Sequence, residues 1–316
     1  MSSDNKNNSK DSGNGHITVG VLALQGAFEE HQRCLEAVGY QTRQVKTPRE
    51  LDGIDGIVLP GGESTAMGLI GTQDGMWTAL QTFVHSGKPV WGTCAGMILL
   101  AERCVGTSAV IENGQSLIGG MDVLVCRNYF GSQISSFEMS TPAPPTDDNN
   151  DDDDVSSQVP YPGVFIRAPA ILSVGEDVDV LGKVVATPSR HAAVVLKELE
   201  RKIAAGDHNI MRMEVVDGLN RHDGAQLDYV TVKKEQQQPC PAPDGMREEK
   251  KESCCVIAEQ PRPRIELPGA SDGTNAREVI CAARKNNMLI TSFHPELTGD
   301  YRWHSYFGKM VSSNKQ

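Results

Sequence analysis

The stretch Gly92-Thr93-Cys94-Ala95-Gly96 constrains this chain most, because it puts a cysteine between two glycines where an apolar strand passes into an apolar helix. Residues 88–91 predict a short buried strand, and residues 97–101 predict a helix. Small flanking residues relieve crowding at such a turn and leave the side chain exposed above the sheet, as in the G-x-S-x-G nucleophile elbow. We therefore interpret Cys94 as a nucleophile.

Strands and helices alternate along the first hundred residues. Strands are expected at residues 17–24, 41–45, 56–59 and 90–91, and helices at residues 27–38, from Ser64 onward and at residues 76–85. This order predicts a parallel sheet with helices on both faces and a functional site at the carboxyl ends of its strands.

Shorter strands of antiparallel character are expected past Gly106. They cover residues 121–126, 163–166 and 170–174, with a final hairpin of residues 279–283 and 288–293. The hairpin turns around Asn286-Asn287 and leads directly into His294.

The sequence carries a formal net charge of −11. Nucleic acids and anionic membranes bind basic surfaces, so this charge argues against both as partners. No apolar run approaches the roughly 20 residues that span a bilayer, and residues 1–15 do not have the pattern of a signal sequence. We therefore expect a soluble, cytoplasmic protein. Its eight cysteines follow no regular framework, so disulfides are not expected.

We expect one globular domain over residues 16–312, preceded by a disordered tail at residues 1–15. Residues 139–161 and 188–276 are foreign to the alternating framework and are expected to be disordered insertions. The second of them contains one plausible helix, at residues 192–205.

Neither insertion has the pattern of a metal site. The acidic run at residues 151–154 lacks the spaced ligands, the turn glycine and the closing glutamate of a calcium loop. Cys240, Cys254 and Cys255 form no C-x-x-C pair, which disfavours zinc. We expect no metal and no cofactor.

A cysteine nucleophile needs a base, and the base needs an orienting group. His294-Pro295-Glu296 supplies both, because the proline biases His294 toward an extended conformation and presents imidazole and carboxylate stiffly at a strand end. Alone, this tripeptide is more often a surface turn; beside the Cys94 elbow, the catalytic interpretation is favoured.

The turn Gly61-Gly62-Glu63-Ser64 follows a buried strand and opens a helix. It could be a tight connection with Ser64 as N-cap, or a phosphate loop, although no complete phosphate-loop motif is present. An oxyanion role fits better: the N–H groups of Gly62 and Ala95 could together stabilise a tetrahedral intermediate.

These elements together resemble the class I (triad-type) glutamine amidotransferases. More specifically, the chain resembles the family of glutaminase subunits of pyridoxal 5'-phosphate synthases. The phrases that carry the resemblance are V-L-A-L-Q-G-A (21–27), L-P-G-G-E-S-T (59–65), G-T-C-A-G (92–96), R-N-Y-F-G-S-Q (127–133), F-I-R-A-P (165–169) and S-F-H-P-E-L-T (292–298).

The resemblance implies a flavodoxin-like three-layer α/β/α sandwich, with a mostly parallel sheet and an antiparallel extension. It implies Cys94 as nucleophile, His294 as general acid/base and Glu296 as the group that orients His294. The residues it implies for binding L-glutamine are Gly62, Glu63, Ser64, Arg127, Ile166 and Arg167. Without the resemblance, a surface salt bridge is the favoured interpretation of both Arg127 and Arg167. His31 is expected to be an ordinary histidine.

The implied activity is hydrolysis of L-glutamine to glutamate and ammonia through a cysteine thioester. The implied partner is a (β/α)8-barrel synthase subunit that uses the ammonia to build pyridoxal 5'-phosphate, the active form of vitamin B6. The alternatives are a glutaminase for another synthase, a thiol hydrolase of γ-glutamyl compounds, and a regulatory binding protein that no longer turns over.

Overall fold

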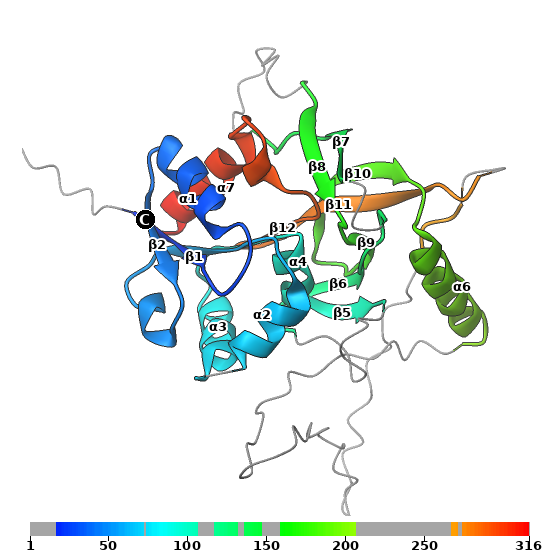
Figure 1. Cartoon of the computed structure of the whole chain (residues 1–316), viewed down its shortest axis with the longest axis horizontal. Coiled ribbons are helices and arrows are strands. Elements are labelled where there is room, and N and C mark those ends of the chain that lie inside the picture. The colour runs from blue at the N-terminus through cyan, green and yellow to red at the C-terminus, as the bar shows by residue number, and fades with distance from the viewer. Residues whose placement is uncertain are drawn as a thin grey trace, which may run out of the picture.

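The computed structural model describes residues 17–72, 74–106, 117–131, 136–146, 159–206, 267–270 and 274–315. Its core is a ten-stranded sheet between two layers of helices (Figure 1). A separate two-stranded sheet, β7 with β8, lies beside it.

The first half of the chain builds the parallel part of the sheet. Its elements are β1 (Thr18–Leu22), α1 (Phe28–Ala37), β2 (Gln41–Val45), the 3-10 helix η1 (Pro48–Leu51), β3 (Gly56–Leu59), α2 (Ser64–Gly71), α3 (Met76–His85), β4 (Val90–Thr93) and α4 (Ala95–Leu100). Apolar runs form the strands, and Gly39, with a φ of +92°, follows α1 where a left-handed residue suits a helix end. The predicted alternation of strand and helix is confirmed.

The second half adds most of the antiparallel extension. Its elements are β5 (Ala101–Val105), β6 (Met121–Cys126), β7 (Ser136–Thr141), β8 (Tyr161–Ile166), β9 (Ala170–Val174), β10 (Asp179–Ala186), α6 (Arg190–Ala204), β11 (Arg277–Lys285), β12 (Met288–Thr291), the 3-10 helix η2 (Pro295–Leu297) and α7 (Arg302–Asn314). The predicted final hairpin is present as the antiparallel pair β11–β12.

The strand order is β2-β1-β3-β4-β12-β11-β9-β6-β5, with β10 paired to β11. From β2 to β12 every neighbouring pair is parallel. The remaining pairs are antiparallel except β5 with β6. The last strand of the chain therefore lies beside β4, in the same direction, although about two hundred residues separate them in sequence.

Each face of the sheet has its own apolar core. Helices α1 and α7 cover one face, where Leu35 and Phe307 pack with Trp91. Helices α2, α3 and α4 cover the other, where Met67 and Leu80 are among the buried side chains. The flavodoxin-like three-layer architecture expected from the sequence is therefore confirmed.

Three sequence expectations need correction. The helix expected through residue 101 ends at Leu100, because Ala101 begins β5, a strand that pairs with β6 and that the sequence did not predict. The first insertion is narrower than residues 139–161, because the β7–β8 hairpin pairs Thr141 with Tyr161. The second, residues 188–276, begins with the ordered helix α6, which buries Ala192, Leu196 and Leu199.

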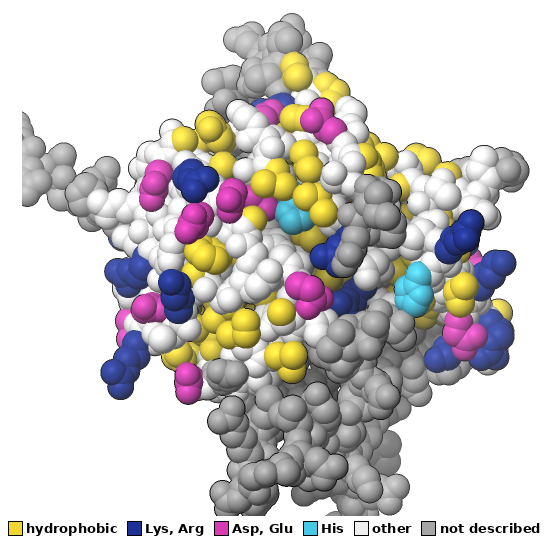
Figure 2. All heavy atoms as spheres, viewed as in Figure 1, with side chains coloured by type: hydrophobic (Ala, Val, Ile, Leu, Met, Phe, Trp, Pro, Cys, Tyr) yellow, Lys and Arg dark blue, Asp and Glu magenta, His cyan; other side chains and the backbone are white. Residues whose placement is uncertain are grey.

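Other expectations lie outside the described residues. These are the tail at residues 1–15, the acidic run at residues 151–154, and Cys240, Cys254 and Cys255. No helix within the described ranges has the length and apolarity needed to cross a membrane. Figure 2 shows basic and acidic side chains interspersed over the face seen in Figure 1.

The glycines around Cys94 allow a close approach of helix α4 to the sheet. A Cβ on Gly92 would lie 2.6 Å from the carbonyl carbon of Gly96. A Cβ on Gly96 would overlap the carbonyl oxygen of Leu59 in β3. Because the atoms that a Cβ would meet belong to the backbone, moving them would cost more free energy than moving a side chain. The elbow therefore requires glycine at both positions.

We expect Gly96→Ala to lower the free energy of unfolding by about 1–3 kcal/mol, because the added methyl group overpacks the contact between α4 and β3. Urea denaturation measures the loss. Gly299→Ala is the matched control, since a Cβ there meets no atom within 4 Å. Equal stability of the two variants would refute this account of the elbow.

Candidate active site

Cys94 occupies the turn between β4 and α4 in a backbone conformation unusual for a residue with a side chain. Its φ is 47° and its ψ is −99°. The Cys94 N–H donates to the carbonyl oxygen of Thr291 at 2.8 Å, which ties the turn to the end of β12. Strained backbone of this kind is a feature of nucleophile elbows.

The parallel pairing of β4 with β12 brings the far end of the chain to this turn. Thr93 and Thr291 are register partners, so the residues that follow the two strands leave the sheet side by side. The His294 N–H donates to the carbonyl oxygen of Val164 at 2.8 Å, which fixes the segment against β8. Cys94 and His294, distant in sequence, thus meet at one edge of the sheet.

The imidazole of His294 lies between a thiol and a carboxylate. Its Nδ1 is 2.7 Å from Oε1 of Glu296, and both side chains are buried. Because the ionised carboxylate only accepts, Nδ1 carries the proton and Nε2 is the nitrogen left for the Cys94 side chain, with which the ring also interacts. A Cβ on Gly61 would lie 2.7 Å from Nδ1 and 3.4 Å from the Cys94 Cβ, so glycine is needed for this approach.

Burial and charge act in opposite directions on these two groups. Burial lowers the pKa of His294, but Cys94 and Glu296 outweigh it and raise that pKa well above its ordinary value. Burial raises the pKa of Glu296, but neighbouring imidazoles and the hydrogen bond from His294 lower it to about 2. The arrangement therefore favours an imidazolium beside a carboxylate.

The Gly62-Glu63-Ser64 turn lies between β3 and α2, next to the turn that follows β1. The Glu63 carboxylate accepts from the Ala66 N–H at 2.7 Å and caps α2, a role the sequence had suggested for Ser64. The Glu63 N–H donates to the Gln25 side chain at 2.7 Å. Gly26, with a φ of +101°, leaves no room for a Cβ against the Gly61 carbonyl.

Arg127 follows β6 and reaches this turn. It is 6% exposed, so the surface salt bridge weighed from the sequence is wrong. Its guanidinium lies 3.6 Å from Glu63 and donates to the Thr65 hydroxyl at 3.2 Å. A buried guanidinium needs such partners and can offer its remaining N–H groups to an anionic ligand.

Ile166 ends β8, and Arg167 follows it with a φ of 47°. The Val164 bond to His294 places this strand end near the imidazole. Unlike Arg127, Arg167 has no ion pair with another described residue.

The two N–H groups expected to form an oxyanion site lie at comparable turns: Gly62 precedes α2, and Ala95 is the first residue of α4.

The sequence did not identify His31 as part of this region. His31 is fully buried in α1, and its Nε2 lies 3.3 Å from Oε2 of Glu296. The sequence feature that could have identified its burial is its position, because His31 lies on the same apolar stripe as Phe28, Leu35 and Val38. A polar residue inside such a stripe must find a buried partner.

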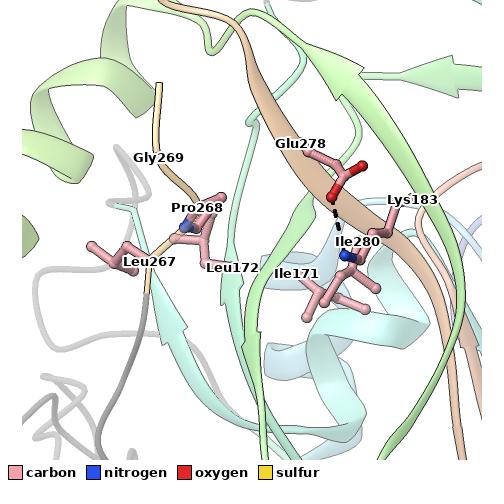
Figure 3. A pocket seen from close by; sticks show the side chains of 8 residues that line it. All are labelled: Ile171, Leu172, Lys183, Leu267, Pro268, Gly269, Glu278 and Ile280. Carbon is pink, nitrogen blue, oxygen red and sulfur yellow. Dashed lines mark hydrogen bonds and ion pairs between the residues drawn. The ribbon is translucent and has the colours of Figure 1, made fainter. Parts of the chain in front are cut away.

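A pocket of about 260 Å³ lies elsewhere, between β9, β10, β11 and the segment at residues 267–269 (Figure 3). None of the predicted site residues lines it. Its polar feature is the ion pair of Lys183 with Glu278 at 3.0 Å, and both side chains are at least half exposed. An exposed pair of this kind contributes little energy and no chemistry.

Comparison with known proteins gives three consistent matches. A family model described as the SNO glutamine amidotransferase family matches residues 21–214. The chain is 36% identical over 300 residues to the probable pyridoxal 5'-phosphate synthase subunit PDX2 of Arabidopsis thaliana, covering 95% of this chain and 88% of the relative. It is 46% identical over 168 residues to the pyridoxal 5'-phosphate synthase subunit PdxT of Bacillus licheniformis, covering 53% and 76%.

A solved structure titled as a glutamine amidotransferase superimposes with a TM-score of 0.55 at 25% identity, covering 93% of this chain and 98% of that one. The family match, the long alignment to PDX2 and the shared fold all agree with the elbow and the strand pairing described above. The chain belongs to the SNO glutamine amidotransferase family.

Proposed function

We propose that this protein is the glutaminase subunit of a pyridoxal 5'-phosphate synthase, with Cys94, His294 and Glu296 as its catalytic triad. The observation that carries the proposal is the convergence of thiol, imidazole and carboxylate at the carboxyl ends of β4 and β12. The names of the PDX2 and PdxT relatives support the pathway.

In this mechanism the Cys94 thiolate attacks the side-chain amide carbon of L-glutamine. The carbon–nitrogen bond breaks as His294 gives its Nε2 proton to the departing nitrogen, so ammonia leaves and a γ-glutamyl thioester remains. Water then attacks the thioester while His294 takes a proton from it. Glutamate leaves, and the Cys94–His294 pair is restored.

Glu296 acts through His294. Its hydrogen bond to Nδ1 keeps the proton on that nitrogen, so Nε2 faces the reacting atoms, and its charge stabilises the imidazolium. The negative oxygen of each tetrahedral intermediate would accept from the N–H groups of Gly62 and Ala95.

The remaining residues of the site match the two charged ends of an amino acid. Arg127 and Arg167 are suited to the α-carboxylate, because a guanidinium binds a carboxylate with paired N–H groups. Glu63 and the backbone carbonyl of Ile166 are suited to the ammonium. The turn at Gly62, Glu63 and Ser64 would hold the substrate against the thiol.

Ammonia produced here would pass to a (β/α)8-barrel synthase subunit, where it would be incorporated into pyridoxal 5'-phosphate. No cofactor is needed for the hydrolytic half of this reaction. We expect glutamine hydrolysis to depend on the partner, because ammonia released into solution would be lost to the synthase.

The test is a glutaminase assay with and without the synthase subunit. We expect the subunit to stimulate the wild-type enzyme, and Cys94→Ala to lower the stimulated rate by about a thousandfold or more while still docking. Cys281→Ala is the matched control, since Cys281 is a buried thiol of β11 whose pKa is raised by burial and not by any of the predicted site residues. Retained hydrolysis by Cys94→Ala would overturn the proposal.

The triad roles predict an order of effects. We expect His294→Ala to lower kcat by about tenfold more than Glu296→Gln does, because removing the acid/base stops both proton transfers while removing its orienting charge only weakens them. Steady-state kinetics with the synthase subunit measures both. A lower kcat for Glu296→Gln would contradict the assigned roles.

The lowered pKa of Glu296 predicts a pH dependence of stability. A carboxylate whose folded-state pKa is depressed contributes stability above its unfolded pKa and loses it as the pH falls. The window therefore runs from its ordinary value of 4.5 down to about 2.

We expect Glu296→Gln to lose stability less steeply than wild type in this window, by about one proton or ~1.4 kcal/mol per pH unit. Urea unfolding at a series of pH values between about 2 and 5.5 measures both slopes, which should converge at the top of that range. Parallel curves throughout the acid range would refute the depressed pKa.

A further inference from the structure

The proposed triad uses only one carboxylate oxygen of Glu296, and the second oxygen is buried as well. Oε1 accepts from His294, but Oε2 has no hydrogen bond of good geometry within the described ranges. Nε2 of His31 lies 3.3 Å from it. A buried carboxylate oxygen facing one imidazole nitrogen requires that nitrogen to carry a proton, since two lone pairs would repel.

The proton position on His31 follows from its neighbours. Nε2 also forms a hydrogen bond of 3.1 Å with the Thr93 hydroxyl, and a proton on this nitrogen attracts the Glu296 carboxylate electrostatically at 3.3 Å. Nδ1 lies 3.0 Å from Nε2 of His304 in α7. Burial lowers the pKa of His31 more strongly than Glu296 raises it, which favours the neutral ring. Nδ1 of His31 therefore accepts a hydrogen bond from His304.

The two histidines are held rigidly in the core. Both are fully buried, and the Trp91 ring meets His31 at 5.5 Å and His304 at 5.0 Å between ring centroids, both in edge-on geometry. Nδ1 of His304 has no hydrogen-bond partner within the described residues, and burial lowers the pKa of this ring well below its ordinary value. This chain of contacts thus ends inside the protein. It is suited to orienting the Glu296 carboxylate and not to carrying protons to solvent.

We propose that His31 is a positioning residue for the triad: its Nε2–H holds the second carboxylate oxygen of Glu296, and His304 holds His31 in that orientation. The carboxylate is then fixed in its plane between two imidazoles, with one on each oxygen. This inference rests on the proposed function, because it takes Glu296 as the group that orients His294.

A matched pair of substitutions separates the two contacts of His31. In His31→Gln the side-chain amide can reach the position of Nε2 and still donate to Glu296. In His31→Asn the shorter amide reaches only the position of Nδ1, so it keeps the His304 side and loses Glu296. Both variants bury an amide, and Leu35→Val, a neighbouring core change in the same helix, controls for loss of packing.

Kinetics with the synthase subunit supplies the readout. We expect His31→Asn to lower kcat by about tenfold with KM changed less than about twofold, and His31→Gln to stay within about threefold of wild type. Leu35→Val should keep wild-type kcat. Equal losses in the Gln and Asn variants, or full activity of both, would overturn the positioning role.

Two further measurements keep the test decisive. If both variants fail to fold, nitrogen chemical shifts of the wild-type histidines report the tautomer: a proton on Nε2 of His31 supports the proposal, and a proton on Nδ1 overturns it. The rate of Cys94→Ala in the same assay tests the proposed function separately. An inactive Cys94→Ala with a fully active His31→Asn would refute only the role of His31.

Discussion

The whole site depends on the parallel pairing of β12 with β4. These strands are far apart in sequence, yet their register aligns Thr93 with Thr291 and joins the two backbones again at the Cys94 N–H. Without this pairing, a strained cysteine turn and a His-Pro-Glu segment would be unrelated surface features. With it, both segments leave the sheet at the carboxyl ends of neighbouring parallel strands, where helix α4 begins.

Close packing then fixes how the side chains of the site lie relative to one another. Glycine at positions 61, 92 and 96 lets the imidazole, the strand and the helix approach each other more closely than any Cβ would permit. Burial alone would neutralise both His294 and Glu296, but Cys94 and Glu296 raise the pKa of His294, and His31 and His294 lower the pKa of Glu296, so each charged form is favoured. The chemistry therefore relies on a low-dielectric site whose charges are held by specific partners.

Local patterns predicted much of this from the sequence. Strands β2, β3, β6 and β9 and helix α3 have the bounds that apolar periodicity and turn residues indicated. Strands β5 and β7 were missed, because β5 directly continues an apolar helical run and β7 leads into a Pro- and Asp-rich stretch, and the partner of each strand is set by the tertiary structure. Arg127 looked like a surface residue, and only its position behind the Glu63 turn explains its burial.

The sequence by itself determined the residue types and their local settings: a glycine-flanked cysteine at a strand end, a stiff His-Pro-Glu segment, and an amphipathic helix with His31 in its apolar stripe. Only the tertiary structure decided which of these groups meet. Register and helix packing are long-range properties, so no local pattern could indicate that His31 and His304 lie behind Glu296. The reason is physical: a buried histidine is specified by the partners that satisfy it, and those partners come from other elements of the fold.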